Sequence, residues 1–282
     1  MATRLETPAR SGRTRTAGAW PVSTLATVAG IVLALPVVVL VARAVFDGSL
    51  AMALGTRVVI DALTLSLLTT SASIALTITL GVPLAFVLAR RTFRAAALLE
   101  AAVDLPIVLP PSVAGLALLL VLGRRGLLCE PLHAIGLELP FTTAAVVIAQ
   151  TFVSAPFFIR SARTGIAGVP RDLEDAARVD GASEVQLFRA VTLPLAAPAF
   201  AAGLVMCWAR ALGEFGATIM FAGNVEGRTQ TLPLVVYGEF QSGGLDASIA
   251  AAAILVLAAF GVLVAVRLLH WRSALDTRGT LG

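Results

Sequence analysis

The sequence is dominated by long apolar runs, and such runs leave few folds open to it. A helix needs about 20 mainly apolar residues to cross the hydrocarbon core of a bilayer. Charged residues make up 13% of the 282 residues, compared with about 25% in a soluble domain. We therefore predict an all-α membrane protein with six transmembrane helices within residues 19–272. The predicted spans are 21–46, 61–89, 99–122, 141–162, 194–222 and 248–271.

The distribution of arginine orients these spans. Every one of the 21 basic residues is an arginine. Fifteen lie in the N-terminal tail, the second and fourth connections and the end of the chain, whereas five lie in the other connections. Because cytoplasmic loops carry an excess of basic residues, we expect both termini and the charged loop 170–193 in the cytoplasm. Residues 1–18 are then a disordered basic tail, and residues 273–282 are a second cytoplasmic tail.

The composition argues against several kinds of active site. A phosphate-binding loop of the Walker type requires a lysine, and this chain has none. The two histidines, His133 and His270, are far apart and lack ligand spacing with the two cysteines. The net charge of +4 follows from the arginine-rich loops and indicates no nucleic-acid partner. We predict that the chain is not an enzyme, has no catalytic residue and binds no metal or cofactor.

A charged segment, PRDLEDAARVDGASEVQLFRAVTLP at 170–194, lies between two apolar runs. Pro170 disfavours continuation of the fourth span. Asp172 is expected to cap a first short helix over residues 173–180, because its carboxylate can accept from free backbone N–H groups. Gly181 follows, and glycine tolerates the left-handed conformation that often ends a helix.

A second short helix is expected after this turn. Ser183 and Gln186 have the spacing of a capping box. Leu193-Pro194 is expected to end the helix and to begin the fifth span, since proline is favoured in a first turn. Two interpretations remain open on physical grounds: a rigid surface on which another protein packs, and a hairpin on the membrane surface without a partner.

The segment resembles the EAA loop of permease subunits of bacterial ABC importers. That pattern is Glu-Ala-Ala, three residues, glycine, nine residues and Ile-x-Leu-Pro. Here it reads Asp175-Ala176-Ala177, then Gly181, then Val191-Thr192-Leu193-Pro194, with aspartate for glutamate and valine for isoleucine. The resemblance implies the type I ABC importer permease fold and a coupling helix that seats in a groove of a separate ATPase subunit. It implies coupling roles for Leu173, Glu174, Asp175, Ala176, Ala177, Asp180, Gly181, Ala182, Leu193 and Pro194.

Two charges fall within the fifth apolar run. Arg210 and Glu214 are four residues apart, so they share one face of a helix. A charge at the centre of a bilayer costs about 2.5–3.5 kcal/mol, so both are expected to face protein or water. They either lie beside a translocation path or form a structural ion pair near the outer interface.

A second stretch resembles the permeases of molybdate and sulfate importers, most closely those for molybdate. The residues that carry this resemblance are Leu212 to Thr218, Asn224, Gly227, Thr229, Thr231-Leu232-Pro233 and Leu105-Pro106-x-x-Leu109-Pro110-Pro111. With the EAA loop, the resemblance covers about residues 57–270. It implies transport of molybdate or tungstate, with sulfate or thiosulfate as the alternative. Candidates for the path are Ser112, Arg210, Glu214, Thr218 and Asn224.

The resemblance also implies an assembly in the bacterial cytoplasmic membrane. Two permease copies, most simply a homodimer, would enclose the path. Two ATPase subunits would use ATP and Mg²⁺ on the cytoplasmic side, and an oxyanion-binding protein would dock outside. Two other classes remain: an ion-coupled secondary transporter, for which Asp61, Asp104 and Glu214 are the candidate proton carriers, and a membrane scaffold that transports nothing.

Overall fold

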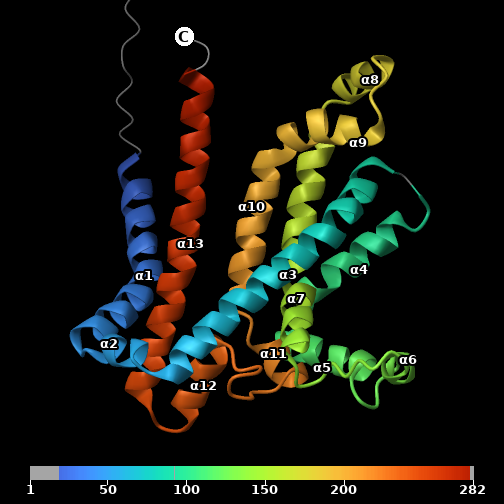
Figure 1. Cartoon of the computed structure of the whole chain (residues 1–282). Coiled ribbons are helices and arrows are strands. Elements are labelled where there is room, and N and C mark those ends of the chain that lie inside the picture. The colour runs from blue at the N-terminus through green and yellow to red at the C-terminus, as the bar shows by residue number, and fades with distance from the viewer. Residues whose placement is uncertain (1–18, 92, 280–282) are drawn as a thin grey trace, which may run out of the picture.

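The structure, a computed structural model, describes residues 19–91 and 93–279, with side chains for residues 23–91 and 93–264. Every regular element within those ranges is helical (Figure 1). In chain order they are α1 (Ala19–Phe46), α2 (Ser49–Leu54), α3 (Arg57–Arg90), α4 (Ala96–Val108), α5 (Pro111–Leu122), α6 (Cys129–Ala134), α7 (Thr143–Ala167), α8 (Arg171–Val179), α9 (Glu184–Leu187), the π-helical turn η1 (Phe188–Thr192), α10 (Leu193–Leu212), α11 (Gly216–Phe221), α12 (Leu232–Gln241) and α13 (Leu245–Gly279).

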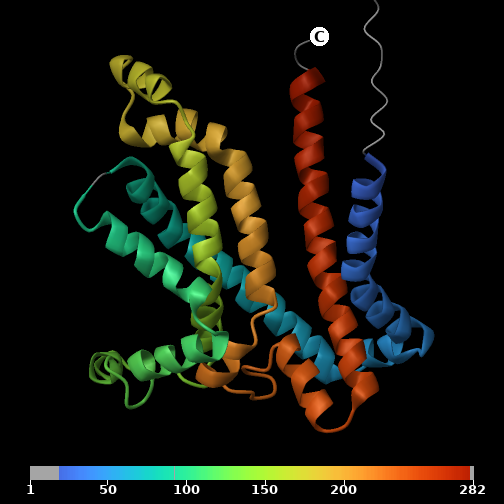
Figure 2. The same ribbon diagram turned by 180° about the vertical axis from the view of Figure 1, so that it is seen from behind.

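The long helices form two groups. The helices α3, α7 and α10 pack against one another as a central bundle, and α1 and α13 lie side by side as a second group (Figures 1 and 2). The second group is joined to the first through α2, α12 and the beginning of α3. This arrangement confirms the predicted all-α fold.

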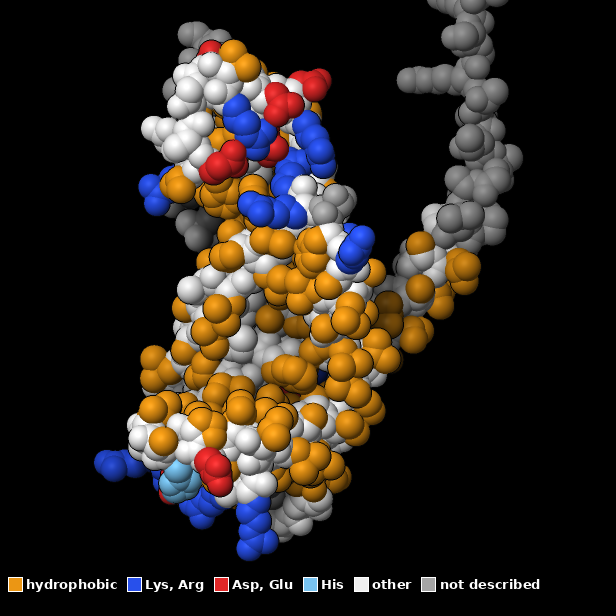
Figure 3. All heavy atoms as spheres, turned by 90° about the vertical axis from the view of Figure 1, so that its right-hand side faces the viewer, with side chains coloured by type: hydrophobic (Ala, Val, Ile, Leu, Met, Phe, Trp, Pro, Cys, Tyr) orange, Lys and Arg blue, Asp and Glu red, His pale blue; other side chains and the backbone are white. Residues whose placement is uncertain are grey.

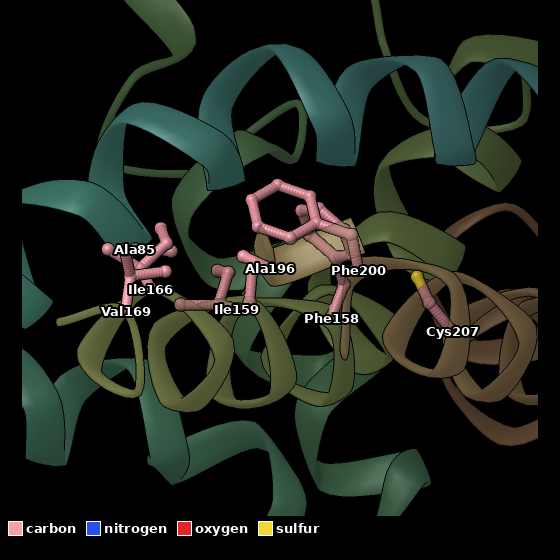
Figure 4. Close-up of a cluster of buried hydrophobic side chains, with 9 residues drawn as sticks. Ala85, Phe158, Ile159, Ile166, Val169, Ala196, Phe200 and Cys207 are labelled. Atoms are coloured by element: carbon pink, nitrogen blue, oxygen red, sulfur yellow. The ribbon is translucent and has the colours of Figure 1, made fainter. Parts of the chain in front are cut away.

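The core of the central bundle contains a pair of packed aromatic rings, and its helices are very close together. The ring centroids of Phe158 on α7 and Phe200 on α10 are 5.7 Å apart in an edge-to-face arrangement (Figure 4). A Cβ atom at Gly165 would lie 2.5 Å from the Cβ of Ala199. Small residues therefore let the α7 and α10 backbones approach, which is how helices in a bilayer gain contact without a hydrophobic driving force.

A seam of small polar side chains runs along the buried face of α3. Ser66, Thr69, Thr70, Ser73 and Thr77 are all at most 1% exposed. Two of them bond to α7: the Thr151 hydroxyl donates to Ser73 Oγ at 3.0 Å, and the Gln150 amide donates to Thr70 Oγ1 at 3.4 Å. These bonds fix the rotation of α3 against its neighbours in surroundings that hold little water.

Within the described residues, five helices are long and apolar enough to cross a membrane. Figure 3 shows apolar side chains over the middle of one face, with charged side chains gathered toward its two ends. Five of the six predicted spans correspond to the long helices α1, α3, α7, α10 and α13.

The third predicted span, 99–122, is not one helix. It is divided into α4 and α5, because Leu109 and Pro110 both have extended backbone, with ψ of 135°. Each of these residues precedes a proline, and a proline ring disfavours helical backbone in the residue before it. The prediction of one span over 99–122 is thus corrected to two helices that are separated at Leu109 and Pro110.

The ends of the fifth and sixth runs also differ from prediction. Residues 194–222 do not form one helix, since α10 ends at Leu212 and a three-residue connection leads into α11. The helix α13 continues to Gly279, so most of the predicted tail 273–282 extends the last helix. The predicted tail 1–18 and residues 280–282 lie outside the described residues.

The ends of the helices are sorted as the arginine pattern predicts. The beginning of α1, the end of α13, the end of α3 and α8 all lie toward one end of the molecule (Figure 1). The helices α2, α6, α11 and α12 lie toward the other end (Figure 1). Which end faces the cytoplasm stays a prediction.

Candidate functional site

The first short helix of the charged segment begins earlier than expected. α8 starts at Arg171, with Pro170 as the N-cap residue and no side chain capping it. The prediction that Asp172 caps this helix was therefore wrong. Pro170 already fixes a backbone angle suited to entering a helix, and Asp172 lies inside the first turn, where its negative charge still suits the positive end of the helix dipole.

The turn after α8 has the geometry predicted for Gly181. Its φ is +87°, in the left-handed region. The Ala182 N–H donates to the Ala177 carbonyl, and the Gly181 N–H donates to the Arg178 carbonyl, both at 3.0 Å. This pair of bonds is the Schellman arrangement that closes the end of a helix. The direction in which the chain leaves α8 is thus fixed by backbone bonds.

The capping box at the start of α9 is confirmed, but the predicted end of that helix is wrong. The Gln186 N–H donates to Ser183 Oγ, and Gln186 Oε1 accepts from the Ser183 N–H. α9 then runs without a break through the π turn η1 into α10. The wide turn contains Ala190, whose carbonyl the ring of Pro194 would strike in a regular α-helix.

Glu174 points inward and holds α8 to the bundle. The residue is 3% exposed. Its Oε1 accepts from Arg90 Nη2 at 2.7 Å and from the Thr192 hydroxyl at 2.8 Å. Arg90 Nη2 also donates to the Val169 carbonyl at 3.1 Å. Sequence reasoning missed Arg90 and Thr192 as members of this site. We call Arg90, Glu174 and Thr192 the buried joint.

Apart from Glu174, α8 is largely exposed, and charged residues such as Asp175 stand among its apolar ones. Leu173 and Val179 of α8 have exposed fractions of 49% and 87%. Val185 of α9 is 62% exposed and borders a groove with Phe86 of α3. The other predicted coupling residues lie around them: Asp175, Ala176, Asp180, Gly181 and Pro194 are exposed, and Ala177, Ala182 and Leu193 are half-buried. Apolar side chains exposed beyond the membrane helices are typical of a protein-binding surface.

Arg178 fastens the two short helices to each other. Its Nη1 donates to Asp175 at 2.8 Å, and its Nε donates to Glu184 at 3.0 Å. The hydrogen bond to Glu184 raises the pKa of the Arg178 guanidinium above its ordinary value. This exposed bridge and the Gly181 turn keep α8 and α9 at a fixed angle.

Arg210 and Glu214 form an ion pair, as one of the two sequence interpretations requires. Arg210 Nη1 lies 2.6 Å from Glu214 Oε2, and the Glu214 side chain is fully buried. Glu214 Oε1 accepts from the Ala217 N–H at 2.7 Å, which places its charge at the beginning of α11. Arg210 keeps 28% of its side chain exposed. Glu214 therefore has a structural role, and Arg210 is the partner that can still reach other groups.

Two of the three remaining path candidates, Ser112 and Thr218, lie on α5 and α11, the helices that follow the two breaks. A Cβ at Gly216 would lie 2.8 Å from Pro111 Cβ and 3.1 Å from the Ser112 nitrogen, so the beginnings of α5 and α11 touch. Ser112 is exposed and Thr218 is fully buried. Asn224 is exposed in the loop after α11. The fold thus brings the α5 and α11 candidates together, while Asn224 lies at the surface.

Comparison with known proteins gives one family. The model of the inner membrane component of binding-protein-dependent transport systems matches residues 79–272. The molybdenum transport system permease protein ModB of Mycobacterium tuberculosis is 44% identical over 205 residues, or 73% of this chain and 77% of that protein. The protein of the same name in Escherichia coli is 39% identical over 199 residues, or 70% and 87% of the two chains.

Solved structures agree on the fold. A bacterial ABC transporter that imports the acidic polysaccharide alginate has a TM-score of 0.71 at 17% identity, covering 90% of this chain and 96% of its own. The MetNI methionine ABC transporter has a TM-score of 0.55 at 19% identity, covering 76% and 93%. The chain has the fold of a type I ABC importer permease, and it belongs to the family of inner membrane components of binding-protein-dependent transport systems.

Proposed function

We propose that this chain is the membrane-spanning subunit of an ATP-driven importer that carries molybdate, or the similar oxyanion tungstate, into the cytoplasm. The observation that supports the substrate is the 44% identity to the Mycobacterium tuberculosis permease, which is named for molybdenum transport. The matched region covers 73% of this chain. It is therefore long enough to include both the coupling segment and the interrupted helices.

In this proposal, α8 and α9 are the surface on which a separate ATPase subunit docks. The exposed Leu173 and Val179 of α8 supply apolar contact area. The Schellman turn, the capping box and the Arg178 bridge hold that surface rigid before any partner arrives. A preformed surface loses less conformational entropy on binding. The ATPase subunit binds ATP and Mg²⁺, because this chain has no lysine for a phosphate-binding loop.

The translocation path is proposed to lie between two copies of the chain. The groove between α3, α10 and α13 within one copy is lined by aliphatic side chains and Trp208, which do not suit a dianion. A second copy, two ATPase subunits and an external oxyanion-binding protein complete the assembly. One of the structures with this fold is an alginate transporter in complex with a periplasmic protein.

Arg210 is the proposed anion contact of the path. Its guanidinium has five N–H donors, and one of its nitrogens is paired with the buried Glu214. The exposed part of the side chain leaves the remaining donors able to contact an oxyanion. Ser112, exposed at the beginning of α5, is the proposed hydroxyl contact. In the proposed orientation, both chain termini and α8 lie on the cytoplasmic side.

The test is reconstitution of the complete complex. The permease is co-purified with its partner ATPase and binding protein and placed in lipid nanodiscs. We expect molybdate and tungstate, presented by the binding protein, to stimulate ATP hydrolysis, and sulfate to stimulate it less. Stimulation by sulfate or thiosulfate alone would assign the chain to the sulfate branch. Uptake driven by a proton gradient without ATP would contradict the ABC assignment.

A further inference from the structure

The EAA-like segment has one face toward the helix bundle and one face toward solvent. A single carboxylate, that of Glu174, makes the contacts on the face toward the bundle. Asp175, which occupies the position of the motif's glutamate, is exposed. Its neighbour Glu174 is 3% exposed and turns away from the proposed docking surface. A residue expected from the sequence to couple to the ATPase therefore has its contacts within this chain.

Glu174 bonds to α3 and η1, and its partner Arg90 also reaches the chain just after α7. Arg90 is the last residue of α3, and Thr192 is the last residue of η1, directly before α10. The Val169 carbonyl, which Arg90 also contacts, follows the end of α7. α8 is otherwise joined to the bundle by the short 168–170 turn and by the loop into α9. The buried joint is thus the point where α3, α7 and α10 meet the coupling segment.

A gain in folding stability does not by itself explain why a charged pair is buried at this joint. The side chains of Arg90 and Glu174 are 11% and 4% exposed, so both charges have lost most of their water. A buried ion pair often stabilises a fold no more than apolar side chains of the same volume would. Its distinguishing property is direction, because the guanidinium and the carboxylate bind in one geometry. Thr192 adds a third fixed direction at a fully buried site.

The π turn gives the joint a second distinctive feature. Thr192 ends a five-residue π turn, and single π turns within helices are frequently found at functional sites. The π turn lies between the docking surface and α10. A displacement of α8 therefore reaches α10 through this turn.

We propose that Arg90, Glu174 and Thr192 are positioning residues that transmit a displacement of α8 to α3 and α10. This inference rests on the proposed function, because it presumes that an ATPase moves α8. When the ATPase moves α8, Glu174 moves with it. The ion pair with Arg90 then transmits the displacement to α3, and the hydrogen bond from Thr192 transmits it to α10. The joint makes no contact with ATP or with the transported anion.

The experiment uses near-isosteric variants in the purified permease–ATPase complex with the binding protein and molybdate. Glu174→Gln removes the charge, and Thr192→Val removes the hydroxyl. We expect both to keep the ATPase subunit bound, while the ratio of stimulated to basal ATP hydrolysis falls about tenfold, the effect of losing one hydrogen bond to a charged group. Thr192→Ser restores the hydroxyl and is expected to restore the ratio. Arg90→Gln is expected to lower the ratio in the same way, and Arg94→Gln, a change at an exposed arginine shortly after α3, is its control.

Each outcome supports or overturns the inference. A wild-type ratio in Glu174→Gln and Thr192→Val overturns it and leaves the proposed function intact. The same follows if Thr192→Ser fails like Thr192→Val, or if the loss only tracks a lower melting temperature and less bound ATPase, since the joint would then be merely structural. A wild-type complex that no oxyanion stimulates overturns the proposed function, and the inference with it.

Discussion

Gly203 of α10 lies directly against Ser161 of α7. A Cβ atom at Gly203 would be 2.7 Å from the Cβ of Ser161 and 3.3 Å from the Cα of Phe158. The Ser161 hydroxyl, in turn, donates to the Ala199 carbonyl one turn earlier in α10, at 2.7 Å. The two helices are therefore held at a separation that only a glycine permits, and this separation sets the position of everything attached to their ends.

Gly203→Ala is expected to destabilise the protein by about 1–3 kcal/mol, the usual cost of forcing extra volume into a packed interior. The matched control is Gly30→Ala in α1, where a Cβ would have no neighbour within 4 Å. An alanine there is expected to be neutral or stabilising, since glycine is the poorer helix former. Thermal unfolding of the purified protein in detergent measures both. Equal melting temperatures for the two variants would contradict the close-packing argument.

Gly181→Ala is expected to impair coupling more than stability. The φ of +87° costs an alanine about 1–2 kcal/mol, and relief of that strain would tilt α8 against α9. We expect lower molybdate uptake at a normal level of protein in the membrane. Gly243→Ala is the control, because Gly243, in the loop between α12 and α13, has a φ of +86° and equally open surroundings. Equal uptake in the two variants would remove Gly181 from the coupling mechanism.

Arg210→Met is expected to destabilise the protein by about 3–5 kcal/mol, because it leaves the buried carboxylate of Glu214 without a partner. Glu214→Gln in the same chain is expected to recover much of that stability, since the amide oxygen can still accept from the Ala217 N–H. Unfolding measurements on both single variants and the double variant give the coupling energy. Arg124→Gln, which breaks an exposed pair with Glu138, is the control with little effect. Purely additive losses would contradict the pairing.

Val179→Asp is expected to weaken retention of the ATPase subunit about tenfold or more, as a charge at the centre of a protein interface does. Val179 is 87% exposed on α8, so the change is not expected to affect folding. Leu127→Asp is the control, since Leu127 is 81% exposed and lies outside the coupling segment. Co-purification at fixed salt concentration measures the effect. Undiminished retention in Val179→Asp would place the docking surface elsewhere.

Local signals in the sequence account for much of the coupling segment. Glycine at 181 predicts a left-handed turn, and Ser183 with Gln186 predicts a capping box, because both depend on neighbours only a few residues away. The break at Pro110-Pro111 follows from the same kind of local rule, since each proline constrains the residue before it. The lengths of the apolar runs likewise determine that the chain forms membrane-spanning helices.

What only the tertiary structure decides is which way each side chain faces and what it meets there. Glu174 and Asp175 are adjacent carboxylates, and the local sequence does not show which of them is buried. Glu174 is buried because α8 packs with that face toward Arg90, which is 84 residues away in the chain. The division of 194–222 into α10 and α11 depends similarly on Glu214, which caps α11 while Arg210 neutralises it. Such choices arise from the desolvation of charges on packing, which no spacing along the sequence records.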